Sequence, residues 1–140
     1  MTADRTELNI DVAIFLRRAQ LRKQLACEAA LATIDLTLPQ WGILHAASTQ
    51  PDSSTHGLAL LTGQSDQSAG AVVAGLEKRG LLDRFSAGGR AILHRLTEEG
   101  GRLVGQADRT VDEVMQQELG HFSDNDLKTL RRLLRRVVAP

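Results

Sequence analysis

This sequence of 140 residues has few of the residue types on which several protein classes depend. It has one cysteine, Cys27, so an intrachain disulfide framework is excluded. It has no tyrosine, one tryptophan and three phenylalanines, fewer aromatic side chains than stacking on single-stranded nucleic acid usually requires. Its 17 basic and 17 acidic residues cancel, so a polycation of the histone type is excluded as well. Binding to double-stranded DNA is still allowed, because local charge can differ from the total.

Long apolar runs are also missing. No stretch approaches the roughly 20 apolar residues of a membrane span, so we expect no membrane contact. Residues 1–7 lack the basic start and apolar run of a secretory signal, and we therefore expect a cytoplasmic protein. A chain of this length is expected to form a single domain over residues 1–140.

Apolar residues recur at three- and four-residue spacing along most of the chain, which predicts a mainly α-helical fold. The predicted helices cover residues 8–31, 38–49, 57–62, 66–79, 98–119 and 124–138. Two short extended segments, 81–85 and 91–96, flank a glycine-rich tip at 86–89 and predict a β-hairpin. The expected fold class is therefore mainly α with a small β-wing.

The helix boundaries carry local signals. Helix starts are expected where a side-chain oxygen can accept a hydrogen bond from a free backbone N–H, at Thr37, Ser65, Thr97 and Ser123. Gln40 stands three residues after Thr37 and Asp126 three residues after Ser123, the spacing of a capping box. Gly80 is suited to end the fourth helix in the left-handed conformation.

The segment between residues 58 and 95 has the pattern of a helix-turn-helix followed by a wing. Ala59 is small enough for a close helix crossing, and Gly63, four residues later, tolerates a positive φ in the turn. The next helix presents apolar residues toward the first one, namely Ala69, Val72, Val73 and Leu76. The hairpin then follows directly, so residues 38–97 are predicted to form a winged helix-turn-helix.

These blocks resemble the MarR family of bacterial transcriptional regulators. The resemblance rests on LALLTG at 58–63, LEKRGLLDR at 76–84 and LTEEG at 96–100, and extends over about 8–138. It implies a homodimer whose 8–31 and 100–138 helices dimerise, so that residues 38–97 can bind a palindromic operator in double-stranded DNA. It further implies a repressor that an unknown small-molecule effector releases from DNA.

The resemblance also assigns site residues. DNA contacts are expected from the start of the second helix of the motif and from the wing, at Ser65, Gln67, Ser68, Gly70, Ala71, Arg84 and Arg90. Arg90 matches the arginine of the family's Asp-x-Arg wing motif, whereas Gly88 replaces the aspartate. Trp41 and His45 are candidates for the wall of an effector pocket.

Two alternatives are kept open. Cys27 lies in the first helix and is either a buried, inert thiol or the sensor of a redox-responsive regulator. The chain could also be a winged-helix module that binds a protein and has lost DNA binding.

An enzyme is not expected, because the sequence has no glycine-rich phosphate loop and no Ser-His-Asp arrangement. The four histidines lack zinc-ligand spacing, so neither a metal nor a cofactor is expected.

Overall fold

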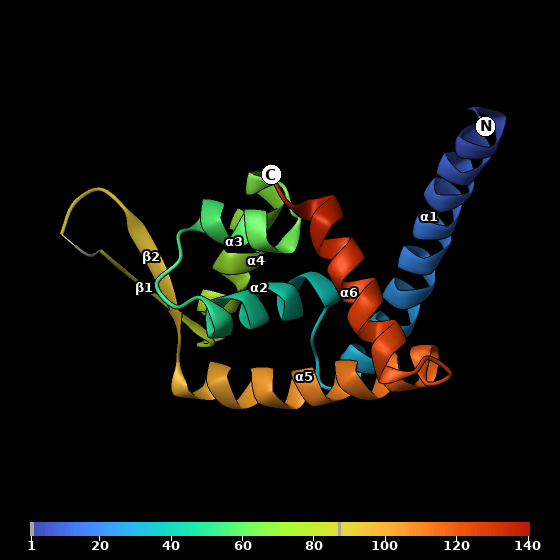
Figure 1. Cartoon of the computed structure of the whole chain (residues 1–140). Coiled ribbons are helices and arrows are strands. Elements are labelled where there is room, and N and C mark those ends of the chain that lie inside the picture. Colours follow the sequence, from blue (N-terminus) through green and yellow to red (C-terminus); the bar gives the residue numbers. More distant parts are fainter. Residues whose placement is uncertain (1, 87) are drawn as a thin grey trace.

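The computed structural model describes residues 2–86 and 88–140, and side chains from Asp4 onward. Within these residues six helices and one hairpin follow each other in the predicted order (Figure 1). The elements are α1 (Thr2–Ala32), α2 (Leu38–Thr49), α3 (Thr55–Thr62), α4 (Asp66–Lys78), β1 (Leu82–Ser86), β2 (Ile92–Leu96), α5 (Glu98–Leu119) and α6 (Asp124–Val138). Met1, part of the expected domain, and Ala87, part of the predicted hairpin tip, lie outside the described residues.

The predicted caps are confirmed. Thr37 accepts from the backbone N–H of Gln40 and Ser123 from that of Asp126, and both pairs complete capping boxes. Ser65 and Thr97 cap α4 and α5, and Gly80 follows α4 with φ 73°.

Two predicted starts are wrong by a few residues. The third helix begins at Thr55 rather than at 57, because the side chain of Ser54 caps it by accepting from the N–H of Gly57. The first helix begins at Thr2 rather than at 8. Residues 2–7 carry no apolar periodicity that would have marked them as part of that helix.

The core lies where α2, α3 and α4 meet the C-terminal part of α1 and the first half of α5. Its largest fully buried side chains are Leu31, Ile43, Leu44, Leu58 and Leu76. The strands β1 and β2 pair antiparallel, with Leu82 opposite Leu96 and Ser86 opposite Ile92. The hairpin projects from this core as a wing (Figure 1).

Helix α5 connects the two ends of the molecule. Its 22 residues correspond to a length of about 33 Å at 1.5 Å per residue. Its N-terminus follows the wing, and its C-terminal half lies beside α1, where Arg22 and Glu118 form an ion pair (Figure 1). The wing and the α1–α6 end are therefore held apart by a single continuous helix.

At the α1–α6 end, both helices expose apolar side chains that pack against nothing else in the part of the chain that the structure describes. Helix α6 buries none of its residues, and it exposes Leu127, Leu133, Leu134, Val137 and Val138. The first two-thirds of α1 expose a similar set: Leu8, Ile10, Val12, Ile14, Phe15, Leu16 and Leu21. Exposed apolar surface of this extent in a folded chain indicates an interaction surface.

No helix within residues 2–86 and 88–140 combines the length and apolarity needed to cross a bilayer.

The contact between α5 and the wing root predicts a sharp difference between two neighbouring glycines. A Cβ at Gly100 would overlap the carbonyl oxygen of Leu81, whereas a Cβ at Gly101 would meet no atom within 4 Å. Gly100→Ala should therefore lower the free energy of unfolding by about 1–3 kcal/mol, the usual cost of overpacking. Gly101→Ala is the matched control and should raise it by about 0.5–1 kcal/mol, because alanine favours helix interiors. Thermal unfolding of both variants measures this, and equal midpoints would contradict the close packing of α5 on Leu81.

Candidate nucleic-acid interface and adjoining pocket

The turn between α3 and α4 is built as the sequence predicts. Gly63 ends α3 in the left-handed region with φ 69°, and its N–H donates to the carbonyl of Ala59. Two residues later Ser65 starts α4 by accepting from the N–H of Ser68 at 3.1 Å. Ala69 and Leu76 are buried against the rest of the motif. The face of α4 that carries these two residues is fixed against the core, so the opposite face of the helix lies toward solvent.

The residues predicted to contact DNA on α4 lie on that outward face. Ser65, Gln67, Ser68 and Ala71 are exposed, and Gly70 is half-buried. A Cβ at Gly70 would meet no atom within 4 Å, so the surface at this point is open. The helix start therefore offers short polar side chains and exposed backbone, which suit close approach to a phosphate chain or a groove.

One acidic residue interrupts this surface. Asp66 is the first residue of α4, and its Oδ1 lies 2.8 Å from Nδ1 of His56 on α3. Both side chains are about two-thirds exposed. The carboxylate on the face that would meet DNA thus has a histidine partner on the neighbouring helix.

The two wing arginines occupy different places. Arg84 lies in β1 opposite His94 of β2, and Arg90 lies between the strands, beyond the paired residues. Both are exposed, and within the described residues Arg90 forms no ion pair. The free guanidinium agrees with the replacement of the motif's aspartate by Gly88, and it leaves Arg90 available to a ligand.

The base of the wing is held by contacts that the sequence pattern did not predict. Arg95 of β2 places its guanidinium carbon 3.8 Å from the centre of the Phe85 ring, and its Nε donates to Oδ1 of Asp52 at 3.0 Å. The backbone N–H of His94 donates to the carbonyl of Ser53 at 2.9 Å. The segment between α2 and α3 therefore runs along β2. No local signal pointed to the Arg95–Asp52 and His94–Ser53 pairs, whose members are about 40 residues apart in sequence.

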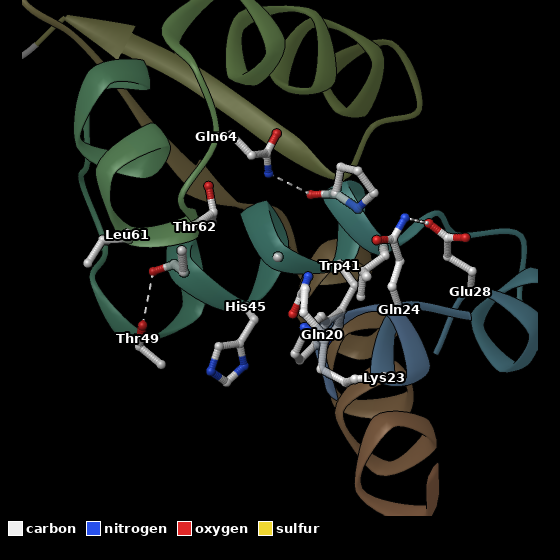
Figure 2. A pocket seen from close by; sticks show the side chains of 14 residues that line it. Gln20, Lys23, Gln24, Glu28, Trp41, His45, Thr49, Leu61, Thr62 and Gln64 are labelled. Carbon is white, nitrogen blue, oxygen red and sulfur yellow. Dashed lines mark hydrogen bonds between the residues drawn. The ribbon is translucent and has the colours of Figure 1, made fainter. Parts of the chain in front are cut away.

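A pocket of about 500 Å³ opens beside the helix-turn-helix, between α1, α2 and α3 (Figure 2). It is lined by Gln20, Lys23, Gln24, Glu28, Leu38, Pro39, Trp41, Gly42, His45, Ala46, Thr49, Leu61, Thr62 and Gln64. The volume is within the range of sites for small molecules. The structure places both predicted pocket residues, Trp41 and His45, in this wall.

Asp108 of α5 holds these two side chains from behind. Its Oδ1 accepts from Nε1 of Trp41 at 2.8 Å and lies 3.0 Å from Nδ1 of His45. The two rings are tilted against each other with centres 5.5 Å apart. Asp108 was not among the predicted pocket residues, because it is more than 60 residues away from Trp41 and His45 in sequence and no local signal links them.

Cys27 is buried, with 1% of its surface exposed. Burial raises the pKa of its thiol, Lys23 lowers it in part, and Glu118 raises it further. A raised pKa leaves little thiolate, the form that reacts with oxidants. These properties favour the inert thiol over the redox sensor.

The histidines lie apart from one another. His45 faces Asp108, His56 faces Asp66, His94 is buried at the wing root, and His121 packs against Phe122. In the part of the chain that the structure describes, no three His, Cys, Asp or Glu side chains gather as a metal site would require.

Comparison with known proteins identifies the architecture. A family model described as MarR family matches residues 34–92. A MarR family transcriptional regulator from Rhodococcus sp. RHA1 superposes with a TM-score of 0.87 at 27% identity, over 95% of this chain and 96% of that one. CouR from Rhodococcus jostii RHA1, solved with p-coumaroyl-CoA, gives 0.86 at 26% identity over 95% of each chain.

A third similar structure comes from Mycobacterium tuberculosis. This MarR family protein, solved with salicylic acid, gives a TM-score of 0.73 at 26% identity, over 88% of this chain and 93% of that one. The same protein has also been solved with DNA, and that structure gives 0.74 at 24% identity. No curated protein sequence matches significantly. The mainly helical fold with a two-stranded wing is therefore that of the winged-helix regulators, as predicted.

Proposed function

The chain belongs to the MarR family of transcriptional regulators, DNA-binding proteins without enzymatic activity, and from this premise we propose a specific mode of action. The protein acts as a homodimeric repressor that binds a palindromic operator and is released by a small-molecule effector. The observation that carries this proposal is the exposed apolar surface of α1 and α6, which is unpartnered among the described residues and lies at the opposite end of α5 from the wing (Figure 1).

The exposed apolar surfaces of α1 and α6 support dimerisation through residues 8–31 and 100–138. Burying apolar surface stabilises a protein by about 25 cal/mol per Å². Pairing with a second copy of the chain would bury the exposed apolar side chains of both helices. A two-fold interface of this sort is self-complementary and would direct two copies of α4 toward one side. Their expected targets are half-sites about 10 base pairs apart on one face of the duplex.

DNA contact is proposed for Ser65, Gln67, Ser68, Gly70 and Ala71 on α4, with Arg84 and Arg90 on the wing. The exposure of the α4 set, apart from half-buried Gly70, and of both arginines supports this assignment. The α4 side chains are short and uncharged, so base readout would come mainly from Gln67. Arg90, free of ion pairs among the described residues, would reach the adjacent minor groove.

The proposed effector is a small aromatic carboxylate or its thioester. Trp41 of α2 offers a flat apolar wall, and Lys23 of α1 adds a cation to the lining of the same pocket (Figure 2). CouR was solved with p-coumaroyl-CoA, and the M. tuberculosis protein with salicylic acid. Because α1 belongs to the proposed dimer region and α2 to the DNA region, a ligand between them would shift their relative position.

The first prediction concerns operator binding. Selection of genomic fragments with the purified protein should enrich a palindrome, and Arg90→Ala should weaken binding to it by about 1–3 kcal/mol because a minor-groove contact is lost. Arg102→Ala is the matched control: Arg102 is also exposed but lies on α5, four residues from its partner Glu98. Equal affinities for Arg90→Ala and the unmodified chain would reject the wing contact. If no fragment is enriched even after refolding without ligand, the protein-binding alternative would be favoured.

The second prediction concerns the dimer. Leu130→Asp or Leu134→Asp should give folded monomers with little operator affinity, because the carboxylate would have to be buried in the interface. Lys128→Asp is the control, since helical periodicity puts residue 128 on the opposite side of α6. Sedimentation or light scattering measures the mass. A stable dimer of both leucine variants would contradict the proposed interface.

The third prediction concerns the effector. Trp41 is the single tryptophan, so its fluorescence should change as salicylate fills the pocket and releases the operator. Lys23→Gln should weaken salicylate binding by about 1.5–3 kcal/mol, the value of a hydrogen bond to a charged group. Lys128→Gln, on a helix away from the pocket, should bind as the unmodified chain does. A signal unaffected by Lys23→Gln would argue against an anionic effector here.

A further inference from the structure

We propose that His94 is the positioning residue of the wing: its buried ring fixes β2 to both helices of the helix-turn-helix and thereby sets where Arg90 meets DNA. This inference rests on the proposed function, and it goes beyond it by assigning a role to a residue that lies away from the DNA-facing surface.

The ring of His94 bridges the two helices of the motif. It is 3% exposed, the one polar or charged residue among the described residues to be fully buried. Its Nε2 lies 2.9 Å from Oγ1 of Thr55, the first residue of α3. Its Nδ1 lies 3.2 Å from Oε1 of Glu77, in the last turn of α4. A single side chain of the wing therefore contacts the start of one helix and the end of the other.

The backbone of the same residue adds a second tie. The N–H of His94 donates to the carbonyl of Ser53, and the two residues form an isolated antiparallel bridge. The next residue, Ser54, caps α3. The segment that begins α3 is thus also hydrogen-bonded to β2, beside which it passes in Figure 1. A change in the position of α3 would be transmitted to the strand.

The opposite face of β2 is held by a weaker contact. Arg95 is placed between Asp52 and the Phe85 ring, but about half of its side chain and of Asp52 is exposed. Exposed ion pairs of this kind contribute little, because water and salt screen them. The orientation of the wing therefore depends mainly on the buried side of the strand, where His94 lies.

The surroundings of this ring favour its neutral form. Burial lowers the pKa of His94, Glu77 of α4 raises it in part, and Arg84 of β1 lowers it. A neutral ring can either accept from or donate to the Thr55 hydroxyl through Nε2, so the 2.9 Å contact is compatible with both tautomers. The ring thus stays bonded to the first residue of α3.

Because Arg90 lies some distance from His94, a small rotation at His94 would move Arg90 relative to DNA. Arg90 is four residues from His94, which is at most about 13 Å if the chain between them is extended. A tilt of about 10° at the anchor would displace Arg90 by roughly 2 Å, more than a hydrogen bond in a groove tolerates. Loss of the His94 contacts should therefore remove the contribution of Arg90 to operator affinity, although the Arg90 side chain itself is unchanged.

A double-mutant cycle on operator affinity tests this. Arg90→Ala is measured in the unmodified chain and in His94→Leu and Thr55→Val chains, the last of which removes only the hydroxyl partner. In the unmodified chain Arg90→Ala should weaken binding roughly 5- to 150-fold. In His94→Leu it should weaken binding about twofold or less, and in Thr55→Val by less than half of the original factor, because residues acting as a unit are not additive.

Thermal unfolding and a matched variant separate positioning from simple stability. Thr33→Val also removes a hydroxyl bonded to the protein, at the end of α1, and should leave the Arg90→Ala effect unchanged. A merely structural His94 would lower the unfolding midpoint yet keep the full Arg90→Ala effect, and that additive result would overturn the proposal. If the unmodified chain binds no operator, the proposed function itself fails and this inference fails with it.

Discussion

The close approach of α5 to the chain segment after α4 is the constraint on which the arrangement of this protein depends. Gly100 has no side chain, so the first turn of α5 rests directly against the backbone of Leu81. Thr97 strengthens this contact: its N–H donates to the carbonyl of Leu81, and its hydroxyl donates to that of Gly80. The end of α4, the base of the wing and the start of α5 are therefore one rigid junction. From it, α5 carries the α1–α6 end at a fixed distance from the wing.

Because the junction of α4, the wing and α5 is rigid, a ligand in the pocket would affect parts of the molecule that it does not touch. Asp108 on α5 holds Trp41 and His45 of α2, while Lys23 and Gln20 approach from α1. Arg79 at the end of α4 donates to the backbone carbonyl of Asp35 in the turn after α1. A ligand among these side chains would act on helices that are already tied to both the α1–α6 end and the helix-turn-helix. Small movements are then transmitted rather than absorbed, because packed interiors are not freely deformable.

Charge is used sparingly on the surface proposed to meet DNA. The start of α4 carries Asp66 and no basic residue, and His56 is its partner on the neighbouring helix. The basic side chains Arg84 and Arg90 belong to the wing instead. Affinity would then depend strongly on how the wing is oriented, since phosphate and minor-groove contacts contribute much of the binding energy. The buried ties between β2 and the α2–α3 segment supply that orientation.

Sequence alone determined the features that depend on neighbours along the chain. The caps at Thr37, Ser65, Thr97 and Ser123 and the positive φ of Gly63 were predictable, because each involves atoms within a few residues. So were the order of the elements and the outward face of α4, which follow from apolar periodicity.

Only the tertiary structure decided which distant residues meet. Asp108 behind the pocket, Asp52 beneath Arg95, and Thr55 and Glu77 around His94 had no local signal. The same holds for Gly100, which looks no different from Gly101 in the sequence and is distinguished by a backbone 19 residues earlier. The reason is physical: local hydrogen bonds are fixed by spacing along the chain, whereas these partners are chosen by how whole helices pack.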